Sequence, residues 1–126
     1  MLAERKAALK AAPVFMYEFA YESEVPVAPG VPYPTKAAHA MEIAFKFDHP
    51  ETSPEAGRRP ERFKAARNMS AAWAAFARTG SPSQAEAAWP PYDTERRATM
   101  ILDAECRVVE DPHREERLLW DELGAA

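Results

Sequence analysis

The spacing of apolar residues divides the chain into short segments with different periods. In VFMYEFAY, residues 14–21, aromatic side chains alternate with smaller apolar ones. This period of two, with its aromatic enrichment, predicts a strand. Both faces of the strand are apolar apart from Glu18, which favours a place inside a covered sheet with neighbours on both sides.

A second period runs through residues 61–80. Apolar residues recur there at spacings of three and four, namely Phe63, Ala66, Met69, Trp73, Phe76 and Ala77. The spacing predicts an amphipathic helix, with Trp73 and Phe76 in the core. Gly80 should end the helix as its C-terminal cap, because Pro82 follows closely and cannot continue it.

Shorter segments complete the expected structure. Residues 2–11 consist of strong helix formers and end before Pro13. Residues 98–104 and 107–111 read as two strands whose link is too short for a helical crossover, so they should pair antiparallel. A closing helix should begin at Asp111 as N-cap, with an apolar side made by Leu118, Leu119 and Leu123.

Proline clusters separate these segments. Residues 22–38 read as one long proline-rich loop, and loops of that length are often functional. His39 stands near its end, before MEIAFKF, residues 41–47, a short apolar run that fits a helix or a strand equally well. Residues 49–60 form another expected loop.

Composition narrows the function classes. The 126 residues fit one domain or a piece of a larger one, and the net charge of −4 is spread along the chain. Nothing marks a nucleic-acid or anionic-membrane surface, and the basic pairs at 58–59 and 96–97 read as solvated loops. No stretch approaches the roughly 20 apolar residues of a membrane span.

Cysteine and histidine usage gives no metal or cofactor signature. Cys106 is the single cysteine and reads as a small packing residue. No ligand spacing suits zinc, so we expect neither metal nor cofactor. The N-terminal segment is not a secretory signal, which with the single cysteine favours a cytoplasmic location, although a longer parent chain would leave the compartment open.

Four segments together carry a family pattern. They are HAMEI from His39 with Phe45 and Phe47 behind it, MSAAWAAFARTGSP at 69–82, WPPY at 89–92, and the two hairpin strands. In this order they resemble the type-B carboxylesterases, relatives of acetylcholinesterase with the α/β-hydrolase fold. The resemblance covers only the C-terminal portion of such an enzyme.

The resemblance implies a role for His39. It would be the general base and acid of a catalytic triad, although taken alone a single loop histidine is more often a surface residue. In this fold the triad arrives in the order Ser, Asp or Glu, then His, so the nucleophile and the acid should lie upstream of these residues. Ser81 lacks the second glycine of the nucleophile motif and Ser70 lies inside the expected helix, so neither is the nucleophile.

The chain also departs from the family around the histidine. Glycine is frequent three residues before it and directly after it, where this chain has Lys36 and Ala40. Proline is common where Ala44 stands. A residue with a Cβ atom in place of glycine restricts the backbone.

Other polar and aromatic residues receive plainer interpretations. Glu42 is interpreted as a structural acid near the site. Two other interpretations, a metal ligand or the triad acid, are less favoured. His49 and His113 should be surface residues. Trp89 and Tyr92 should pack a turn.

The predicted fold class is therefore α/β: the C-terminal part of an α/β-hydrolase domain over residues 1–126, with no second domain. It would have one buried strand, a histidine loop, a long amphipathic helix, a small antiparallel hairpin and a terminal helix. Alone it should be inactive. It could be the piece of a split enzyme that acts on a small carboxylic ester once complemented, a module that self-associates through its sheet edge, or a truncated chain.

Overall fold

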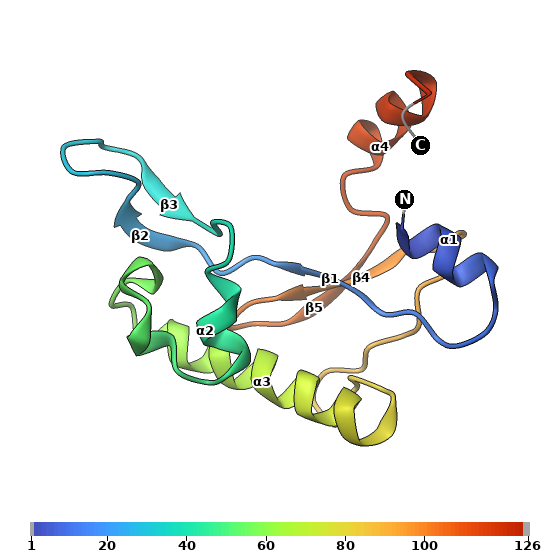
Figure 1. Ribbon diagram of the computed structural model, residues 1–126, viewed down its shortest axis with the longest axis horizontal. Coiled ribbons are helices and arrows are strands. Elements are labelled where there is room, and N and C mark those ends of the chain that lie inside the picture. The colour runs from blue at the N-terminus through green and yellow to red at the C-terminus, as the bar shows by residue number, and fades with distance from the viewer. Residues whose placement is uncertain (1, 125–126) are drawn as a thin grey trace.

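The computed structural model describes residues 2–124, and Figure 1 shows an elongated molecule with a small sheet at its centre. The helices are α1 (Leu2–Ala8), α2 (Glu42–Lys46), α3 (Glu61–Thr79) and α4 (Arg114–Glu122), with two short 3-10 turns at Pro50–Thr52 and Pro54–Ala56. The strands are β1 (Met16–Phe19), β2 (Ser23–Pro26), β3 (Pro34–Lys36), β4 (Ala98–Leu102) and β5 (Arg107–Glu110). Within this part of the chain, no helix has the length and apolar character needed to cross a membrane.

The central sheet has the strand order β1-β4-β5. β1 pairs with β4 in parallel, with Met16 opposite Thr99 and Phe19 opposite Leu102. β4 and β5 pair antiparallel, which confirms the predicted hairpin. The strand predicted over residues 14–21 also forms, but it is shorter and lies at an edge of the sheet, with a neighbour on one side among the described residues.

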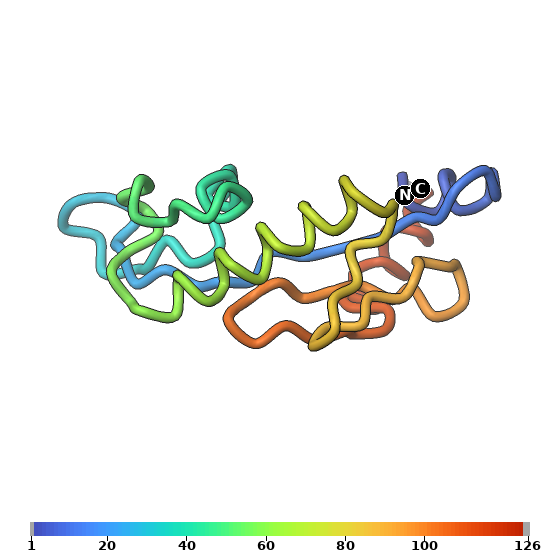
Figure 2. Tube along the Cα trace, turned by 90° about the horizontal axis from the view of Figure 1, so that it is seen from below, coloured from blue at the N-terminus to red at the C-terminus, as the bar shows by residue number. Residues whose placement is uncertain are grey.

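The core lies between one face of this sheet and the helices that connect β1 to β4. All five residues of β4 are buried, and Met100 packs with Met69 of α3 in the same cluster. Phe45 of α2 is fully buried against the end of β1. Figures 1 and 2 show α3 running along the sheet, with α2 beside it.

The sequence predicts one long loop over residues 22–38, and this prediction is wrong. These residues contain β2 and β3, an antiparallel ribbon that projects from the body of the molecule. Ser23 pairs with Lys36, and the Thr35 hydroxyl donates to the Val25 carbonyl at 2.8 Å. Two prolines occupy the ribbon, and proline is tolerated there because a two-stranded ribbon has only edge strands.

The ambiguous run at 41–47 forms a helix. Met41 and Phe45, four residues apart, are both buried and therefore share one side of the turn. The half-buried pair on another side of the turn is also helical in spacing: Lys46 Nζ donates to Glu42 Oε1 at 3.1 Å. Helical spacing of the two core residues decides between the two readings.

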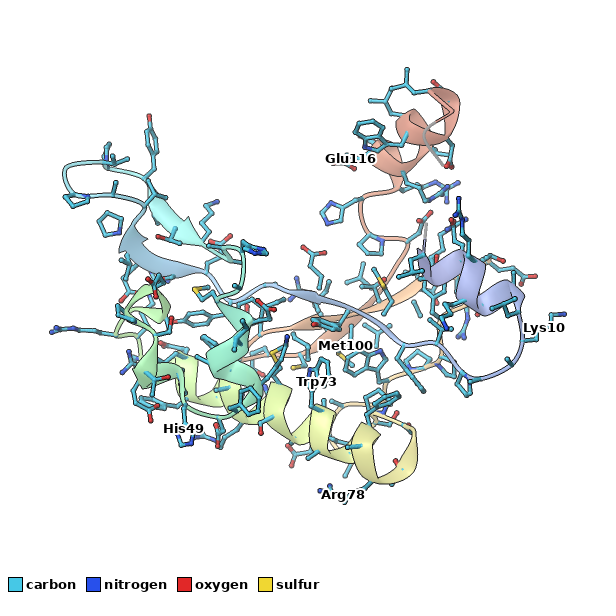
Figure 3. The ribbon with its side chains drawn as sticks, viewed as in Figure 1. Lys10, His49, Trp73, Arg78, Met100 and Glu116 are labelled. Carbon is cyan, nitrogen blue, oxygen red and sulfur yellow. The ribbon has the colours of Figure 1, made fainter. Side chains whose placement is uncertain are left out.

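The long helix is confirmed at both ends but not in its packing. Gly80 has φ 75° and its N–H donates to the Phe76 carbonyl at 2.8 Å, as expected of a left-handed cap. Trp73 and Phe76, however, are 42% and 45% exposed rather than core residues. Trp73, which Figure 3 labels, meets the Tyr17 ring of β1 edge-on at 6.3 Å between centroids. Because β1 is the edge strand, no further strand covers Trp73 in the described part of the chain.

The closing helix differs from the prediction at its start. It begins at Arg114 with His113 as N-cap, so Asp111 does not cap it. Asp111 instead has φ 49°, and its two carboxylate oxygens accept hydrogen bonds from Arg117 at 2.9 and 2.7 Å. No residue of α4 is buried, and its predicted apolar side is exposed to solvent, including Leu118, Leu119 and Leu123.

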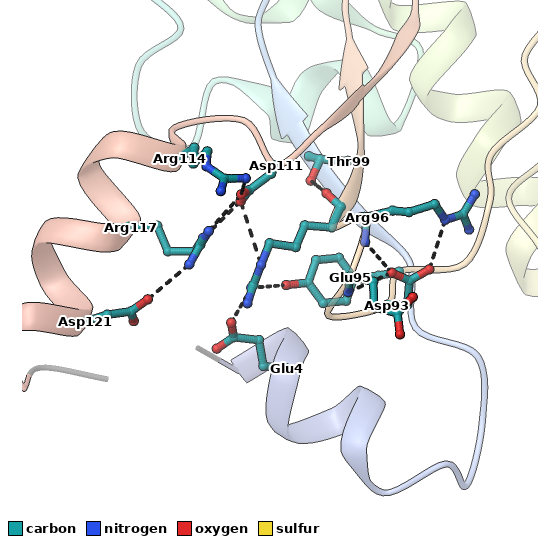
Figure 4. Close-up of polar contacts among 11 residues, drawn as sticks. Glu4, Asp93, Glu95, Arg96, Thr99, Asp111, Arg114, Arg117 and Asp121 are labelled. Atoms are coloured by element: carbon teal, nitrogen blue, oxygen red, sulfur yellow. Dashed lines mark hydrogen bonds and ion pairs between the residues drawn. The ribbon is translucent and has the colours of Figure 1, made fainter.

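Arg97 is not the solvated loop residue that the sequence predicted. Its guanidinium contacts Glu4 of α1, donates to the Tyr92 hydroxyl at 3.0 Å and lies 3.8 Å from Asp111. Figure 4 shows how this network continues through Arg117 to Asp121 of α4. The Arg117 hydrogen bonds hold the pKa of Asp111 below its usual range. Both end helices are therefore attached to the sheet by charged groups.

Candidate functional site

His39 lies in the turn between β3 and α2, and its side chain is exposed. Its ring forms no hydrogen bond with other groups among residues 2–124. Before it, Lys36 of β3 pairs with Ser23 of β2. After it, the ring of Phe45 lies 4.9 Å from that of Phe19. The turn is thus held on both sides.

These two attachments place the His39 turn beyond the carboxyl end of β1. Phe19 is the last residue of β1, and the Ala20 N–H continues the pairing with the Leu102 carbonyl at 2.9 Å. β1 and β4 are parallel, so their carboxyl ends lie side by side at the same end of the sheet. In open α/β sheets, ligands bind outside the carboxyl ends of the strands. His39 therefore stands where this class of fold places its chemistry.

The backbone on both sides of His39 is strained. Lys36 has φ 55° and Ala40 has φ 64°, in the left-handed region that residues with a Cβ atom disfavour. These are the two positions at which the resembling family frequently has glycine. The turn therefore has the left-handed backbone conformation typical of glycine at two residues that carry a Cβ atom, so the surrounding contacts must hold it.

Replacing Ala40 by glycine should therefore stabilise the protein. Relief of the left-handed strain outweighs the added freedom of the unfolded chain, and we expect the free energy of unfolding to rise by about 0.5–1 kcal/mol. Urea denaturation followed by circular dichroism measures the change. Ala37→Gly is a matched control, because Ala37 lies in the same turn without a positive φ, and it should be neutral or destabilising. Equal effects of the two substitutions would contradict the strain argument.

The other candidate residues lie apart from His39. Glu42 forms an ion pair with Lys46, and among residues 2–124 it forms no hydrogen bond or ion pair with His39. His49 lies 3.3 Å from Glu51 on the exposed side of its loop (Figure 3). His113 Nε2 lies 3.0 Å from Glu18, and this contact raises the pKa of His113. His49 and His113 are surface residues, as predicted.

Neither serine considered above forms a pair with a histidine. Ser70 lies within α3, and the backbone of Ser81 is bonded to the Thr79 hydroxyl in the turn after it. Trp89 and Tyr92 are buried, which confirms them as packing residues. Cys106 is half-buried against the core, as a packing residue should be. Residues 2–124 contain no group of three or more side chains arranged to hold a metal ion.

The structure also assembles groups that the sequence analysis missed. Glu4 and Arg97 meet although 93 residues separate them, and no local pattern reports such a contact. Phe15, Tyr17, Trp73 and Phe76 line an apolar groove of about 140 Å³ beside β1. The helical period of Trp73 and Phe76 could have indicated their common face, but not that it would be open.

Comparison with known proteins identifies relatives of this arrangement. A model described as the carboxylesterase family matches residues 2–120. The chain is 38% identical to para-nitrobenzyl esterase of Bacillus subtilis (strain 168) over 109 residues, which is 84% of this chain and 21% of that protein. It is 36% identical to human bile salt-activated lipase over 98 residues, 75% of this chain and 12% of the lipase.

Solved structures give the same result in three dimensions. A para-nitrobenzyl esterase structure superposes with a TM-score of 0.74 at 35% identity, over 87% of this chain and 22% of that one. A thermophilic para-nitrobenzyl esterase reaches a TM-score of 0.77 at 34% identity, over 92% and 23%. These neighbours are esterases of the α/β-hydrolase fold. The chain spans about a fifth of the length of the para-nitrobenzyl esterases that it matches.

Proposed function

The chain belongs to the carboxylesterase family, and from this premise we propose that it supplies the histidine of a serine carboxylic-ester hydrolase. Residues 1–126 would form the C-terminal part of one α/β-hydrolase domain, without a second domain. His39 would act as general base and acid. The nucleophilic serine and the acid that orients His39 would come from the portion of the enzyme that this chain does not span.

One observation carries the proposal: the His39 turn lies beyond the carboxyl ends of the parallel pair β1 and β4, attached on both sides. A general base must reach the group whose proton it takes, so its backbone has to be fixed while its ring stays accessible. The Ser23–Lys36 pair and the Phe19–Phe45 contact fix the backbone, and the ring is exposed.

The chemistry assigned to His39 has two stages. In the first, a ring nitrogen accepts the serine proton while the serine oxygen attacks the ester carbonyl carbon, and the same proton passes to the departing alcohol. In the second, the ring takes a proton from water while the water oxygen attacks the acyl carbon. The proton then returns to serine as the carboxylic acid leaves. No cofactor takes part.

The isolated chain should have no triad activity, because it contributes one of the three members. Loss of the nucleophile leaves at most the residual catalysis of a binding pocket. A small carboxylic ester is therefore the expected substrate of the completed enzyme only.

A chimera tests the proposal. The region of the Bacillus para-nitrobenzyl esterase that aligns with this chain is replaced by residues 1–126, and p-nitrophenyl acetate hydrolysis is measured. We expect turnover well above that of the same esterase with the region deleted. A soluble chimera with native-like circular dichroism and no more turnover than the deletion would refute a catalytic role and favour the alternative of a non-catalytic, self-associating module.

A further inference from the structure

Glu24 of β2 reaches the loop at residues 57–60, which precedes α3. Its Oε1 accepts a hydrogen bond from the Arg58 N–H at 2.7 Å. Its Oε2 is excluded from solvent and accepts no hydrogen bond within the described part of the chain, and Arg59 Nε lies 3.6 Å from it. The Arg58 hydrogen bond lowers the pKa of Glu24, so the carboxylate is charged at neutral pH. The bond is therefore charge-assisted, which makes it roughly twice as strong as a neutral one.

Gly57 leaves the space that this carboxylate occupies. A Cβ atom at position 57 would lie 2.5–2.7 Å from the carboxylate carbon and both oxygens of Glu24, closer than real side-chain atoms approach each other. Gly57 also has φ 72° and ψ −156°, a conformation that is essentially restricted to glycine. Its carbonyl accepts from Arg62 Nη1 of α3. The loop thus makes room for Glu24 and is bound to the first turn of α3.

The β2–β3 ribbon depends on contacts of this kind. A two-stranded ribbon is at best marginally stable by itself, and the register of this one is irregular. Two hydrogen bonds join the base of the ribbon to the segment before α3. The Tyr21 hydroxyl donates to the Ala56 carbonyl at 3.2 Å, and Glu24 accepts from the Arg58 N–H. Glu24 provides the bond that lies within β2 itself.

The ribbon in turn sets the backbone that enters the His39 turn. Lys36 is the last residue of β3, has φ 55° and pairs with Ser23, the neighbour of Glu24 in β2. Ser23 is buried, so this end of the ribbon packs into the molecule. A left-handed residue with a Cβ atom persists only where its surroundings hold it in place. Fixing β2 beside Ser23 therefore also fixes the strained residue three positions before His39.

We propose that Glu24 is a positioning residue for His39, because its carboxylate, held against Gly57, fixes the base of the ribbon that enters the histidine turn. The inference rests on the proposed function and adds a residue that acts through the backbone. Among residues 2–124, Glu24 forms no hydrogen bond or ion pair with His39, so its effect has to pass through β2 and β3.

Two substitutions at Glu24 separate the hydrogen bond from the charge. Glu24→Gln keeps an oxygen that can accept from the Arg58 N–H, whereas Glu24→Ala removes it. Glu22→Ala is the matched control. Glu22 lies two residues away and forms an ion pair with Lys36 at 3.7 Å, in which both side chains are more than 60% exposed, and such pairs contribute little.

In the chimera with the Bacillus esterase, Glu24→Ala should lower kcat for p-nitrophenyl acetate at least about tenfold, since small displacements of a catalytic group are costly. Glu24→Gln should restore kcat to within about threefold of the unsubstituted chimera, and Glu22→Ala should stay within about twofold of it. Circular dichroism checks that each variant keeps the fold. Rescue by glutamine assigns the effect to the hydrogen bond rather than to a general loss of structure.

Hydrogen exchange in the full chain tests the attachment without any catalysis. The Val27 N–H donates to the Tyr33 carbonyl at 3.0 Å within the ribbon, and the Ala20 N–H donates to the Leu102 carbonyl in the central sheet. In Glu24→Ala the Val27 N–H should exchange at least about tenfold faster, while the Ala20 N–H should change little.

Three results would overturn the proposal: unchanged Val27 exchange in Glu24→Ala, equal losses of kcat for the alanine and glutamine variants, or a loss for Glu22→Ala as large as that for Glu24→Ala. Faster Val27 exchange together with an inactive chimera would support the attachment and count against the proposed function. An active chimera in which Glu24→Ala has no effect would keep the proposed function and refute a positioning role for Glu24.

Discussion

Replacing His39 by glutamine in the chimera should lower the rate of p-nitrophenyl acetate hydrolysis by roughly a thousandfold or more. Glutamine keeps a polar side chain of similar reach but cannot accept and return a proton at neutral pH. Because the His39 ring is exposed and makes no hydrogen bond among the described residues, the substitution should leave the free energy of unfolding of the isolated chain unchanged within about 0.5 kcal/mol. Stopped assays at saturating ester measure the loss in kcat.

His49→Gln is the matched control for this substitution. His49 is also an exposed loop histidine, ten residues beyond His39, and its contact is with Glu51. Its replacement should leave the rate within about twofold of the chimera, as expected for a surface residue. A loss of less than about tenfold for His39→Gln, or equal losses for both variants, would exclude a general-base role for His39.

Replacing Phe45 by alanine should destabilise the protein by about 3–4 kcal/mol. Phe45 is fully buried, and its ring lies 4.9 Å from Phe19 and 5.0 Å from Tyr21. The substitution removes the contact that fastens α2 to the end of β1 and leaves a cavity there. Urea denaturation should show a lower midpoint, and the His39 turn should exchange its amide hydrogens faster, since one of its two attachments is lost.

Phe47→Ala provides the control two residues away. Phe47 is 70% exposed and should change the free energy of unfolding by no more than about 0.5 kcal/mol. Similar effects of the two substitutions would mean that α2 is not anchored through Phe45. The placement of His39 by α2 would then lose its physical basis.

Elements with a long or regular period were predictable from the sequence. The period of two around Tyr17 predicted β1, and the spacing from Phe63 to Phe76 predicted α3 with its end at Gly80. The ribbon β2–β3 was not predictable in this way, because its strands have three and four residues and carry prolines rather than an alternating pattern. Its pairing depends on long-range register between Ser23 and Lys36.

Periodicity also shows which residues share a face without showing what covers that face. Trp73 and Phe76 were expected in the core, but both are more than 40% exposed beside β1, the edge strand of the described sheet. The prediction was wrong for a physical reason: helical spacing shows which residues share a face, and no further element among the described residues covers this one.

For the candidate site, the sequence predicted the residue but not its setting. His39 was identified through the segment that follows it, and its catalytic role remains a prediction. The left-handed backbone at Lys36 and Ala40 was indicated only by the family resemblance, because related sequences frequently have glycine at these two positions. The contacts of Arg97 with Glu4 and Asp111 join segments far apart in the chain, and a pair of adjacent arginines gives no sign of them.

The two ends of the molecule should respond differently to ionic strength. The end helices depend on charged contacts, namely Glu4 of α1 with Arg97 and Arg117 of α4 with Asp111. The His39 end depends on packed rings such as Phe19 and Phe45. The Debye length falls from about 10 Å at 0.1 M salt to about 3 Å at 1 M, which weakens partly exposed ion pairs and leaves apolar packing intact. Salt should therefore loosen α1 and α4 while the histidine turn keeps its position.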